Sequence, residues 1–459
     1  MLESHPVKEK PQLFGTDGVR GVAGEFPLDR ATVQSLGRAL GMVLQKSASG
    51  RALRAVLGED TRESSPWLSR AVAAGLRSSG VEVSYAGVIT TPGVAYLTRR
   101  HGFDAGIMVS ASHNPYADNG IKILAGTGTK LGEAQEIEIE NALREISGES
   151  ANSEASPLDP SPSLLEDYLN YLENLAPVNP GKLSPRLVVD CANGASARVV
   201  PTLLKRLKID ARILNDAPDG RNINLSCGSL HPEKMAELTK TSGADLGVAF
   251  DGDADRAIFS TREGRISDGD HVLFAVAPHL KERGQLKGNG VVGTLMTNLG
   301  LELALEQQGI ALKRTPVGDK YVLEEMLRSG INLGGEPSGH IIFSDISLAG
   351  DGMVTLLQIL HLLFESGKCF GELVGGLKQF PQLIRNVRVR EKIPLDSVPE
   401  VAAATEACRK EVGHRGRVVV RYSGTEKLAR VMVEAESAEI VERHAQLIAA
   451  AVDRALGAH

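Results

Sequence analysis

Cysteine is scarce in this sequence, and the cysteines that it has are far apart. The 459 residues include only four. Zinc and redox sites need closely spaced pairs, and a disulfide scaffold needs many cysteines in a short chain. The sequence therefore argues against all three kinds of site and predicts four buried thiols, Cys191, Cys227, Cys369 and Cys408.

Long apolar segments and an excess of basic residues are missing as well. The longest apolar stretch, residues 353–364, holds 12 residues, which is too few to span a bilayer. Residues 1–6 lack the apolar core of a signal peptide. A net charge of −6 argues against a protein that coats nucleic acid. We expect a cytoplasmic protein without membrane or nucleic-acid partners, which would bind anionic ligands in local basic pockets.

Glycine is abundant, with 49 residues, and 42% hydrophobic and 24% charged residues complete a composition typical of an α/β enzyme. The length implies several domains. A strand, a polar loop, a helix and a second strand follow one another from residues 55, 187 and 290, which predicts three similar α/β domains. In the first of these units we expect Ser65 to cap the helix, with Pro66 at its first position, and Gly80 to end it.

The remaining segments suggest where the domains end. Residues 147–163 are rich in serine, proline and acidic residues, which is typical of a linker or long loop. The last stretch combines short strands with helices expected at residues 400–412 and 439–456, which predicts a smaller α+β domain. We expect domain 1 at residues 1–155, domain 2 at 156–256, domain 3 at 257–373 and domain 4 at 374–459.

One stretch places polar side chains where catalytic groups often lie. An apolar run, residues 105–109, ends in small and polar residues, so a buried strand should deliver Ser112 and His113 to a turn at Asn114 and Pro115. Alone, such a Ser-His pair is more often an ordinary turn, because a nucleophile and its base need to be close in space rather than in sequence. Whether this pair is catalytic therefore depends on the other motifs of the sequence.

A second stretch carries clustered carboxylates. The apolar residues 246–250 lead into Asp251, Asp253 and Asp255. Carboxylates at alternate positions are costly to cluster unless a cation neutralises them, and oxygen ligands suit Mg²⁺ or another hard cation. An EF-hand is excluded, because Arg256 and Arg262 occupy the positions of its glycine and its bidentate glutamate. A solvated acidic turn remains the alternative.

Further polar loops give weaker signals. Residues 14–21 bring Asp17 and Arg20 together between glycines, and residues 318–320 and 335–340 are polar loops bracketed by glycine. At residues 421–430, two arginines flank a Ser-Gly-Thr turn between two expected strands. Guanidinium groups, hydroxyls and backbone N–H groups can form a phosphate cradle. The alternative is a hairpin with solvated arginines.

Together these motifs resemble the α-D-phosphohexomutase superfamily, and they occur in the order found there. They are residues 14–21 (FGTDGVRG), 110–115 (SASHNP), 251–256 (DGDADR), 335–340 (GEPSGH) and 421–426 (RYSGTE). Residues 14–18, 91–98 and 292–300 are most similar to the bacterial branch that acts on glucosamine phosphates. The resemblance implies three similar α/β domains with mixed sheets, followed by a smaller α+β domain, around a central cleft.

The resemblance also implies a reaction. A phosphorylated Ser112, with one Mg²⁺ held by Ser112, Asp251, Asp253 and Asp255, would interconvert glucosamine 6-phosphate and glucosamine 1-phosphate. Glucosamine 1,6-bisphosphate would be the intermediate, and it or glucose 1,6-bisphosphate the activator. The product would serve the route to UDP-N-acetylglucosamine and the cell wall. The expected partner is a small phosphosugar, and either a monomer or a homodimer is compatible with the sequence.

Residue roles follow from the same resemblance. Lys122 is the expected general base, Arg20 and His113 would stabilise the transferring group, and His340 would share the acid-base work. The expected substrate-binding residues are Gly318, Asp319, Glu336, Ser338, Arg421, Ser423, Gly424, Thr425 and Arg430. Two residues depart from the usual pattern, Pro337 in the sugar loop and Lys427 beside the phosphate loop, and Pro337 leaves the sugar preference open.

Three other functions remain open at this point. A mutase for mannose or glucose phosphates would use the same chemistry on another sugar. A metal-dependent sugar phosphatase would form the phosphoserine and release its phosphate to water. A sugar-phosphate sensor fits least, because sensing needs no cluster of three carboxylates. Only a mutase explains a second phosphate-binding loop far from Ser112, since a bisphosphate has two anionic ends.

Overall fold

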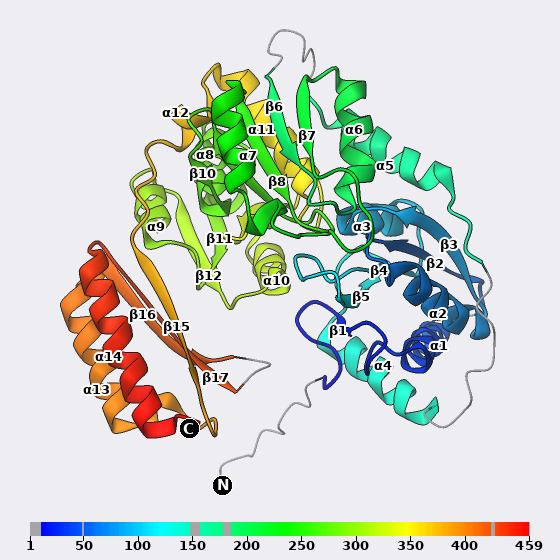
Figure 1. Cartoon of the computed structure of the whole chain (residues 1–459), viewed down its shortest axis with the longest axis horizontal. Helices are drawn as coiled ribbons and strands as arrows, with labels where there is room; N and C mark the ends of the chain where they lie inside the picture. The colour runs from blue at the N-terminus through cyan, green and yellow to red at the C-terminus, as the bar shows by residue number, and fades with distance from the viewer. Residues whose placement is uncertain (1–10, 48–49, 147–156, 178–184, 424–426, 459) are drawn as a thin grey trace. The chain divides into compact units, whose positions relative to one another are not determined.

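The computed structural model describes residues 11–47, 50–146, 157–177, 185–423 and 427–458. By their internal contacts the residues fall into two compact units. The first comprises Met1–Leu295 with Lys313–Gly375, and the second comprises Met296–Leu312 with Gly376–His459. Each unit is described by itself below, with its elements labelled as in Figure 1.

The first sheet of the larger unit has the strand order β1-β5-β4-β2-β3. Strands β4, β2 and β3 are parallel to one another, whereas β5 runs antiparallel to β4 and β1 runs antiparallel to β5. Helices α1, α2 and α4 contribute to the apolar core on one face of this sheet. The elements are β1 (Val19–Val22), α1 (Arg30–Ser47), β2 (Leu53–Glu59), α2 (Ser65–Ser78), β3 (Val81–Val88), α3 (Thr91–Arg100), β4 (Ala105–Val109), β5 (Asp118–Ala125) and α4 (Glu133–Ile146).

The second sheet has the order β10-β9-β8-β6-β7 and is preceded by helix α5 (Pro162–Asn174). Strands β8, β6 and β7 are parallel, and β9 and β10 complete an antiparallel edge. All five residues of β8 are buried, so this strand delivers the acidic loop from the middle of the sheet. The elements are β6 (Leu187–Asp190), α6 (Ser196–Leu207), β7 (Ala211–Leu214), η2 (Gly228–Leu230), α7 (Glu233–Ser242), β8 (Leu246–Phe250), β9 (Ala257–Thr261) and β10 (Ile266–Ser267).

The third sheet has the order β12-β11-β13-β14, with β11 and β13 parallel and β13 and β14 antiparallel. The turn between β13 and β14 carries residues 336–340, so the expected sugar loop lies at a strand end. The elements are α8 (Gly269–Glu282), η3 (Lys287–Asn289), β11 (Gly290–Thr294), β12 (Ala311–Thr315), α10 (Asp319–Ser329), β13 (Leu333–Gly335), β14 (Ile341–Phe343), α11 (Gly352–Ser366) and α12 (Phe370–Val374).

The smaller unit is an antiparallel sheet of order β15-β17-β16, with α13 and α14 packed on one face (Figure 1). Helix α9 belongs to the same unit, because the N–H of Leu299 donates to Glu434 Oε1 at 2.9 Å. The elements are α9 (Leu299–Glu306), β15 (Gln382–Arg388), η4 (Leu395–Ser397), α13 (Pro399–Val412), η5 (Gly413–Arg415), β16 (Gly416–Tyr422), β17 (Leu428–Ala435) and α14 (Ala438–Leu456).

The predicted fold class, three α/β domains with mixed sheets and a smaller α+β domain, is confirmed. Two local predictions are wrong. Ser64 rather than Ser65 occupies the N-cap of α2, because the helix starts one residue earlier, and Cys369 is exposed whereas the other three cysteines are buried. Domain boundaries and the central cleft stay predictions, and we note that β9 and β10 continue the second sheet beyond residue 256. Among the described residues, no helix is long and apolar enough to cross a membrane.

Candidate active site

Ser112 lies three residues beyond the end of β4, in the left-handed backbone region with a φ of 52°. Its side chain is buried, and its hydroxyl donates to Asp251 Oδ2 at 2.6 Å. The ring Nδ1 of His113 lies 3.3 Å from the same hydroxyl. A serine at positive φ is uncommon and is kept there only when its surroundings hold it. Contacts with other parts of the fold must therefore hold this loop.

Arg62 holds the Ser112 loop through hydrogen bonds to its backbone. Its side chain is completely buried and forms an ion pair with Asp60 at 2.8 Å. The guanidinium donates to four backbone carbonyls of the loop, those of Ser112, Asn114, Pro115 and Asp118. Asp60 also accepts from Ser110 Oγ at 2.7 Å, and Ser110 Oγ in turn accepts from the N–H of Ser112. A planar fork of donors that is fully satisfied leaves the loop little freedom.

The second domain fixes the same loop from the other side. Asn224 Nδ2 donates to the carbonyls of Ser112 at 2.8 Å and Asn114 at 3.1 Å. Gly252 lies against the loop so closely that a Cβ on it would come within 2.5 Å of the Ser112 carbonyl oxygen. The glycine of the acidic loop thus permits the close approach that brings Ser112 and Asp251 together.

The three aspartates of the acidic loop form a buried cluster. One carboxylate oxygen from each of Asp251, Asp253 and Asp255 lies within 4.8 Å of the others. Burial, followed by repulsion from Asp255 and Asp253, raises the pKa of Asp251 well above its usual value. Asp253 Oδ1 and Asp255 Oδ1 are buried, and neither has a hydrogen-bond partner among the residues that the structure describes. Buried carboxylate oxygens without donors fit the oxygen-ligand site of a hard divalent cation.

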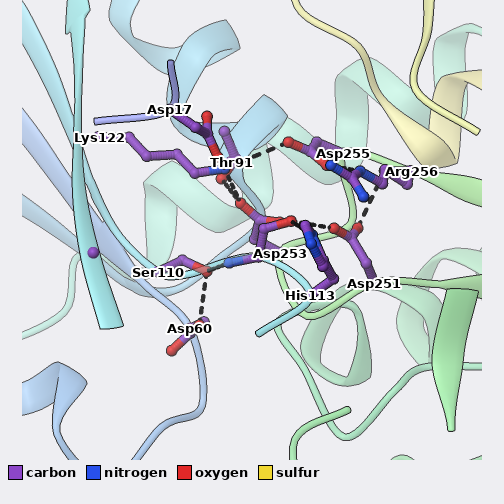
Figure 2. Close-up of polar contacts among 12 residues, drawn as sticks. Asp17, Asp60, Thr91, Ser110, His113, Lys122, Asp251, Asp253, Asp255 and Arg256 are labelled. Carbon is purple, nitrogen blue, oxygen red and sulfur yellow. Dashed lines mark hydrogen bonds and ion pairs between the residues drawn. The ribbon is translucent and has the colours of Figure 1, made fainter. Parts of the chain in front are cut away.

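Lys122, on β5, reaches two of these carboxylates (Figure 2). Its Nζ lies 2.6 Å from Asp253 Oδ2, 3.4 Å from Asp255 Oδ2 and 3.1 Å from Asp17 Oδ2. Burial alone would lower the pKa of Lys122, but the three carboxylates outweigh it and hold the pKa well above its usual value. Within the part of the chain that the structure describes, Asp251 is the carboxylate of the cluster that no lysine contacts.

Two arginines, Arg20 and Arg256, lie close enough to His113, the neighbour of Ser112, to affect its charge. Arg20 pairs with Asp17 and reaches the side-chain oxygen of Asn114 at 3.5 Å. Arg256 Nε lies 3.8 Å from Asp255 Oδ1, and the described part of the chain offers this Nε no hydrogen-bond acceptor. Burial, followed by repulsion from Arg256 and Arg20, lowers the pKa of His113 to about 4. A neutral imidazole between two guanidinium groups suits a site that receives an anion.

The expected sugar loops meet close to the cluster. Glu336 accepts from the N–H of Gly318 at 3.0 Å and from Ser338 Oγ at 3.4 Å. His340 lies 3.8 Å from Asp255 and 3.6 Å from Asp319, and these acids outweigh burial and raise its pKa to about 9. A cavity of about 150 Å³ is lined partly by Asp255, Asp319 and His340. The structure thus brings the sugar loops, the aspartates and Ser112 together.

The expected phosphate loop of the smaller unit holds two like charges side by side. Arg421 and Arg430 are directly paired across β16 and β17, and burial followed by repulsion from Arg430 lowers the pKa of Arg421. Arg430 lies 3.5 Å from Ser423 Oγ, and Lys392 donates to the carbonyl of Ser423 at 2.7 Å. Like charges opposite each other are unfavourable in a sheet unless an anion joins them. Gly424 and Thr425 lie outside the described residues.

Sequence reasoning missed several residues that position the site. They are Asp60, Arg62, Thr91, Lys130, Asn224 and Lys392. Thr91 Oγ1 donates to Asp253, and Lys130 lies between Asp17 and Asp319. The polar residues that follow β2 were a usable signal for Asp60 and Arg62, because catalytic loops follow parallel strands at the same edge. The other four act through partners far away in sequence, which single-sequence patterns do not reveal.

The comparisons with known proteins agree with this geometry. Four domain families of phosphoglucomutase/phosphomannomutase match the chain, α/β/α domain I at residues 11–149, domain II at 166–264, domain III at 268–380 and the C-terminal domain at 385–451. The chain is 50% identical to the phosphoglucosamine mutase of Koribacter versatilis, over 99% of this chain and 100% of that protein.

Solved structures show the same fold. A phosphoglucomutase/phosphomannomutase family protein from Burkholderia thailandensis superposes with a TM-score of 0.78 at 24% identity, covering 97% of this chain and 99% of the other. The N-acetylphosphoglucosamine mutase of Aspergillus fumigatus, solved in complex with GlcNAc-6P and magnesium, gives a TM-score of 0.62 at 18% identity, covering 96% of each chain. The chain therefore belongs to the phosphoglucomutase/phosphomannomutase family, together with the phosphoglucosamine mutases, as its motifs predict.

Proposed function

We propose that the protein is a phosphoglucosamine mutase, an isomerase that interconverts glucosamine 6-phosphate and glucosamine 1-phosphate. The observation that carries this proposal is the Ser112 hydroxyl, held 2.6 Å from Asp251 in a cluster of three buried carboxylates between Arg20 and Arg256. Relatives of that name, such as the one from Koribacter versatilis, match along the whole chain and favour glucosamine over other sugars.

In the proposed reaction Ser112 carries a phosphoryl group. The serine oxygen passes it to O1 of glucosamine 6-phosphate, the 1,6-bisphosphate turns over, and the phosphoryl group from C6 returns to Ser112 and leaves glucosamine 1-phosphate. Mg²⁺ held by Ser112 and the three aspartates would neutralise oxygens of the transferring group. Added glucosamine or glucose 1,6-bisphosphate would prime the serine in the same way.

The side chains around Ser112 divide the remaining tasks. Arg20 and Arg256 would stabilise the charge on the equatorial phosphoryl oxygens, with His113 packed beside the serine. Lys122 and His340 are our candidates for exchanging the proton of the sugar hydroxyl, because both lie next to the aspartates. Gly318, Asp319, Glu336 and Ser338 would bind the sugar ring, since polar groups from two loops meet there.

Product analysis tests this function. The purified protein, incubated with Mg²⁺, a trace of glucose 1,6-bisphosphate and glucosamine 6-phosphate, should form glucosamine 1-phosphate without net inorganic phosphate, as followed by ³¹P NMR. We expect kcat/KM for mannose and glucose phosphates to be at least about tenfold lower. Stoichiometric release of inorganic phosphate would instead identify a phosphatase, and faster turnover of mannose or glucose phosphates would identify a mutase for those sugars.

In the smaller unit, Arg421, Ser423 and Arg430, with Gly424 and Thr425, would hold the phosphate that is not reacting. The two facing arginines support this, because an anion between them removes their repulsion. Arg430→Ala should raise KM about tenfold or more, the scale of a lost hydrogen bond to a charged group, and should release more free bisphosphate per turnover. Arg415→Ala, which removes an exposed ion pair to Glu436 in the same unit, is the matched control. Equal KM and equal bisphosphate release in the two variants would refute this phosphate-binding role.

A further inference from the structure

Ionisable side chains beside the aspartate cluster form a closed ring in which carboxylates alternate with basic groups. Its members are Lys122, Asp17, Lys130, Asp319, His340 and Asp255. On one side of the ring, Lys130 Nζ lies 2.5 Å from Asp17 Oδ1, while Lys122 Nζ lies 3.1 Å from Asp17 Oδ2. Asp17 thus uses Oδ1 for Lys130 and shares Oδ2 between Lys122 and Arg20, so Lys130 is the cation that holds its Oδ1.

The other side of the ring repeats this arrangement. Lys130 Nζ lies 2.8 Å from Asp319 Oδ1, while His340 Nε2 lies 3.6 Å from Asp319 Oδ2. Asp255 closes the ring, because its Oδ2 lies 3.4 Å from Lys122 Nζ and 3.8 Å from His340 Nδ1. Lys130 is therefore the one member of the ring that contacts both Asp17, the partner of Lys122, and Asp319, the partner of His340.

The backbone of Lys130 is held by contacts outside the ring. The residue follows β5 in a tight turn, where Leu124 and Lys130 form an antiparallel bridge and the N–H of Ala125 donates to the Thr129 carbonyl at 2.8 Å. Gly128 adopts a φ of 78° in this turn, and a Cβ on it would come within 2.5 Å of the Ala95 carbonyl oxygen. Leu131 is buried directly after Lys130. Thr129 and Leu131, the two neighbours of Lys130 in the chain, are thus held in place, so the side chain of Lys130 starts from a fixed backbone position.

We propose that Lys130 is a positioning residue, which sets the places of Lys122 and His340 through Asp17 and Asp319. This inference rests on the proposed function. Without Lys130, Asp17 Oδ1 and Asp319 Oδ1 would lose the cation that lies between them and would repel each other. Each side chain is about one-fifth exposed (22% for Asp17 and 20% for Asp319), so each carboxylate has room to shift toward water and to carry its remaining partner with it. The lysine and histidine that they hold would lose their placement, and small misplacements of reacting groups are costly in rate.

Lys130→Met tests the proposal. We expect kcat for the hexose phosphate that the parent isomerises fastest to fall at least about tenfold while KM stays within about twofold, because the proposed role affects the reacting groups and not substrate binding. Lys130→Arg, which keeps a cation able to bind two carboxylates, should recover most of the lost kcat. Lys287→Met is the matched control, since it also removes a lysine ion pair, to Asp345 at 2.6 Å, without touching the ring.

Three results would overturn the proposal. The first is a kcat of Lys130→Met equal to that of the control. The second is a raised KM with unchanged kcat, which would make Lys130 a substrate ligand. The third is a folded Lys130→Arg protein that does not recover kcat. If Lys130→Met does not fold, Lys130→Gln takes its place and must show the same loss of kcat at unchanged KM. Every comparison uses the substrate that the parent protein isomerises. A parent protein that only releases phosphate therefore refutes the proposed function, whereas an active parent with an unaffected Lys130→Met variant refutes only the role of Lys130.

Discussion

Replacing Ser112 by alanine is expected to lower turnover at least about 100-fold, the scale of losing a covalent route or a key catalytic group. The hydroxyl of Ser112 lies 2.6 Å from Asp251 and is the one that the loop, held by Arg62 and Asn224, presents to the aspartate cluster. Alanine removes the oxygen that would carry the phosphoryl group and leaves the loop contacts of the backbone in place. Steady-state assays of isomer formation measure the loss.

Ser110→Ala is the matched control for this substitution. The Ser110 hydroxyl donates to Asp60 and accepts from the N–H of Ser112, so its loss should loosen the loop and cost less than the loss of Ser112. A Ser112→Ala protein that is folded and fully active would exclude Ser112 as the phosphoryl carrier. The same would hold for a phosphate adduct found on Ser110 and absent from Ser112.

Chelation of divalent metal is expected to abolish turnover, and Mg²⁺ should restore it. The reason is the cost of burying three carboxylates within 4.8 Å of one another when Lys122 contacts only two of them. One oxygen of Asp253 and one of Asp255 receive no hydrogen bond from the residues that the structure describes. Metal analysis of the reloaded protein should give one ion per chain. A thermal unfolding scan provides a second readout, because a ligand that binds only the folded state raises its stability.

Asp251→Asn should reduce both the metal content and the stabilisation by Mg²⁺, because it removes one charged ligand. Asp345→Asn is the control, since it changes a half-exposed aspartate that pairs with Lys287 outside the cluster. Full turnover in excess EDTA, with less than one ion per chain, would eliminate the metal from the account. Equal metal content in the two variants would move the metal site away from Asp251.

The strands that carry the site could be predicted from the sequence because each is a short apolar run with a polar end. The predicted runs at residues 105–109 and 246–250 are β4 and β8 in the structure, with the same bounds. In both strands every residue is buried, so hydrophobicity alone marks them. The helix start at Ser64 was missed by one residue, because two adjacent serines are equally good caps.

The contacts that position the site could not be predicted in the same way. Ser112 and Asp251 are joined through the tips of two separate sheets, and Arg62 satisfies carbonyls about 50 residues away. Lys130 follows a turn and has no local pattern that distinguishes it from a surface lysine. Its position becomes meaningful only when β5 pairs with β1 and brings Asp17 next to Lys122. Pairings of this kind depend on tertiary structure, and local sequence does not encode them visibly.

The central claim is that the phosphoryl group on Ser112 enters the sugar, and a single-turnover transfer experiment measures it most directly. Protein labelled with ³²P on Ser112, verified by peptide mass mapping, is mixed with unlabelled glucosamine 6-phosphate and Mg²⁺ and quenched at short times. The account predicts that label leaves the Ser112 peptide, appears first in the bisphosphate and then in glucosamine 1-phosphate, with no labelled inorganic phosphate. Label that stays on the protein while isomer forms, or that leaves only as inorganic phosphate, would contradict it.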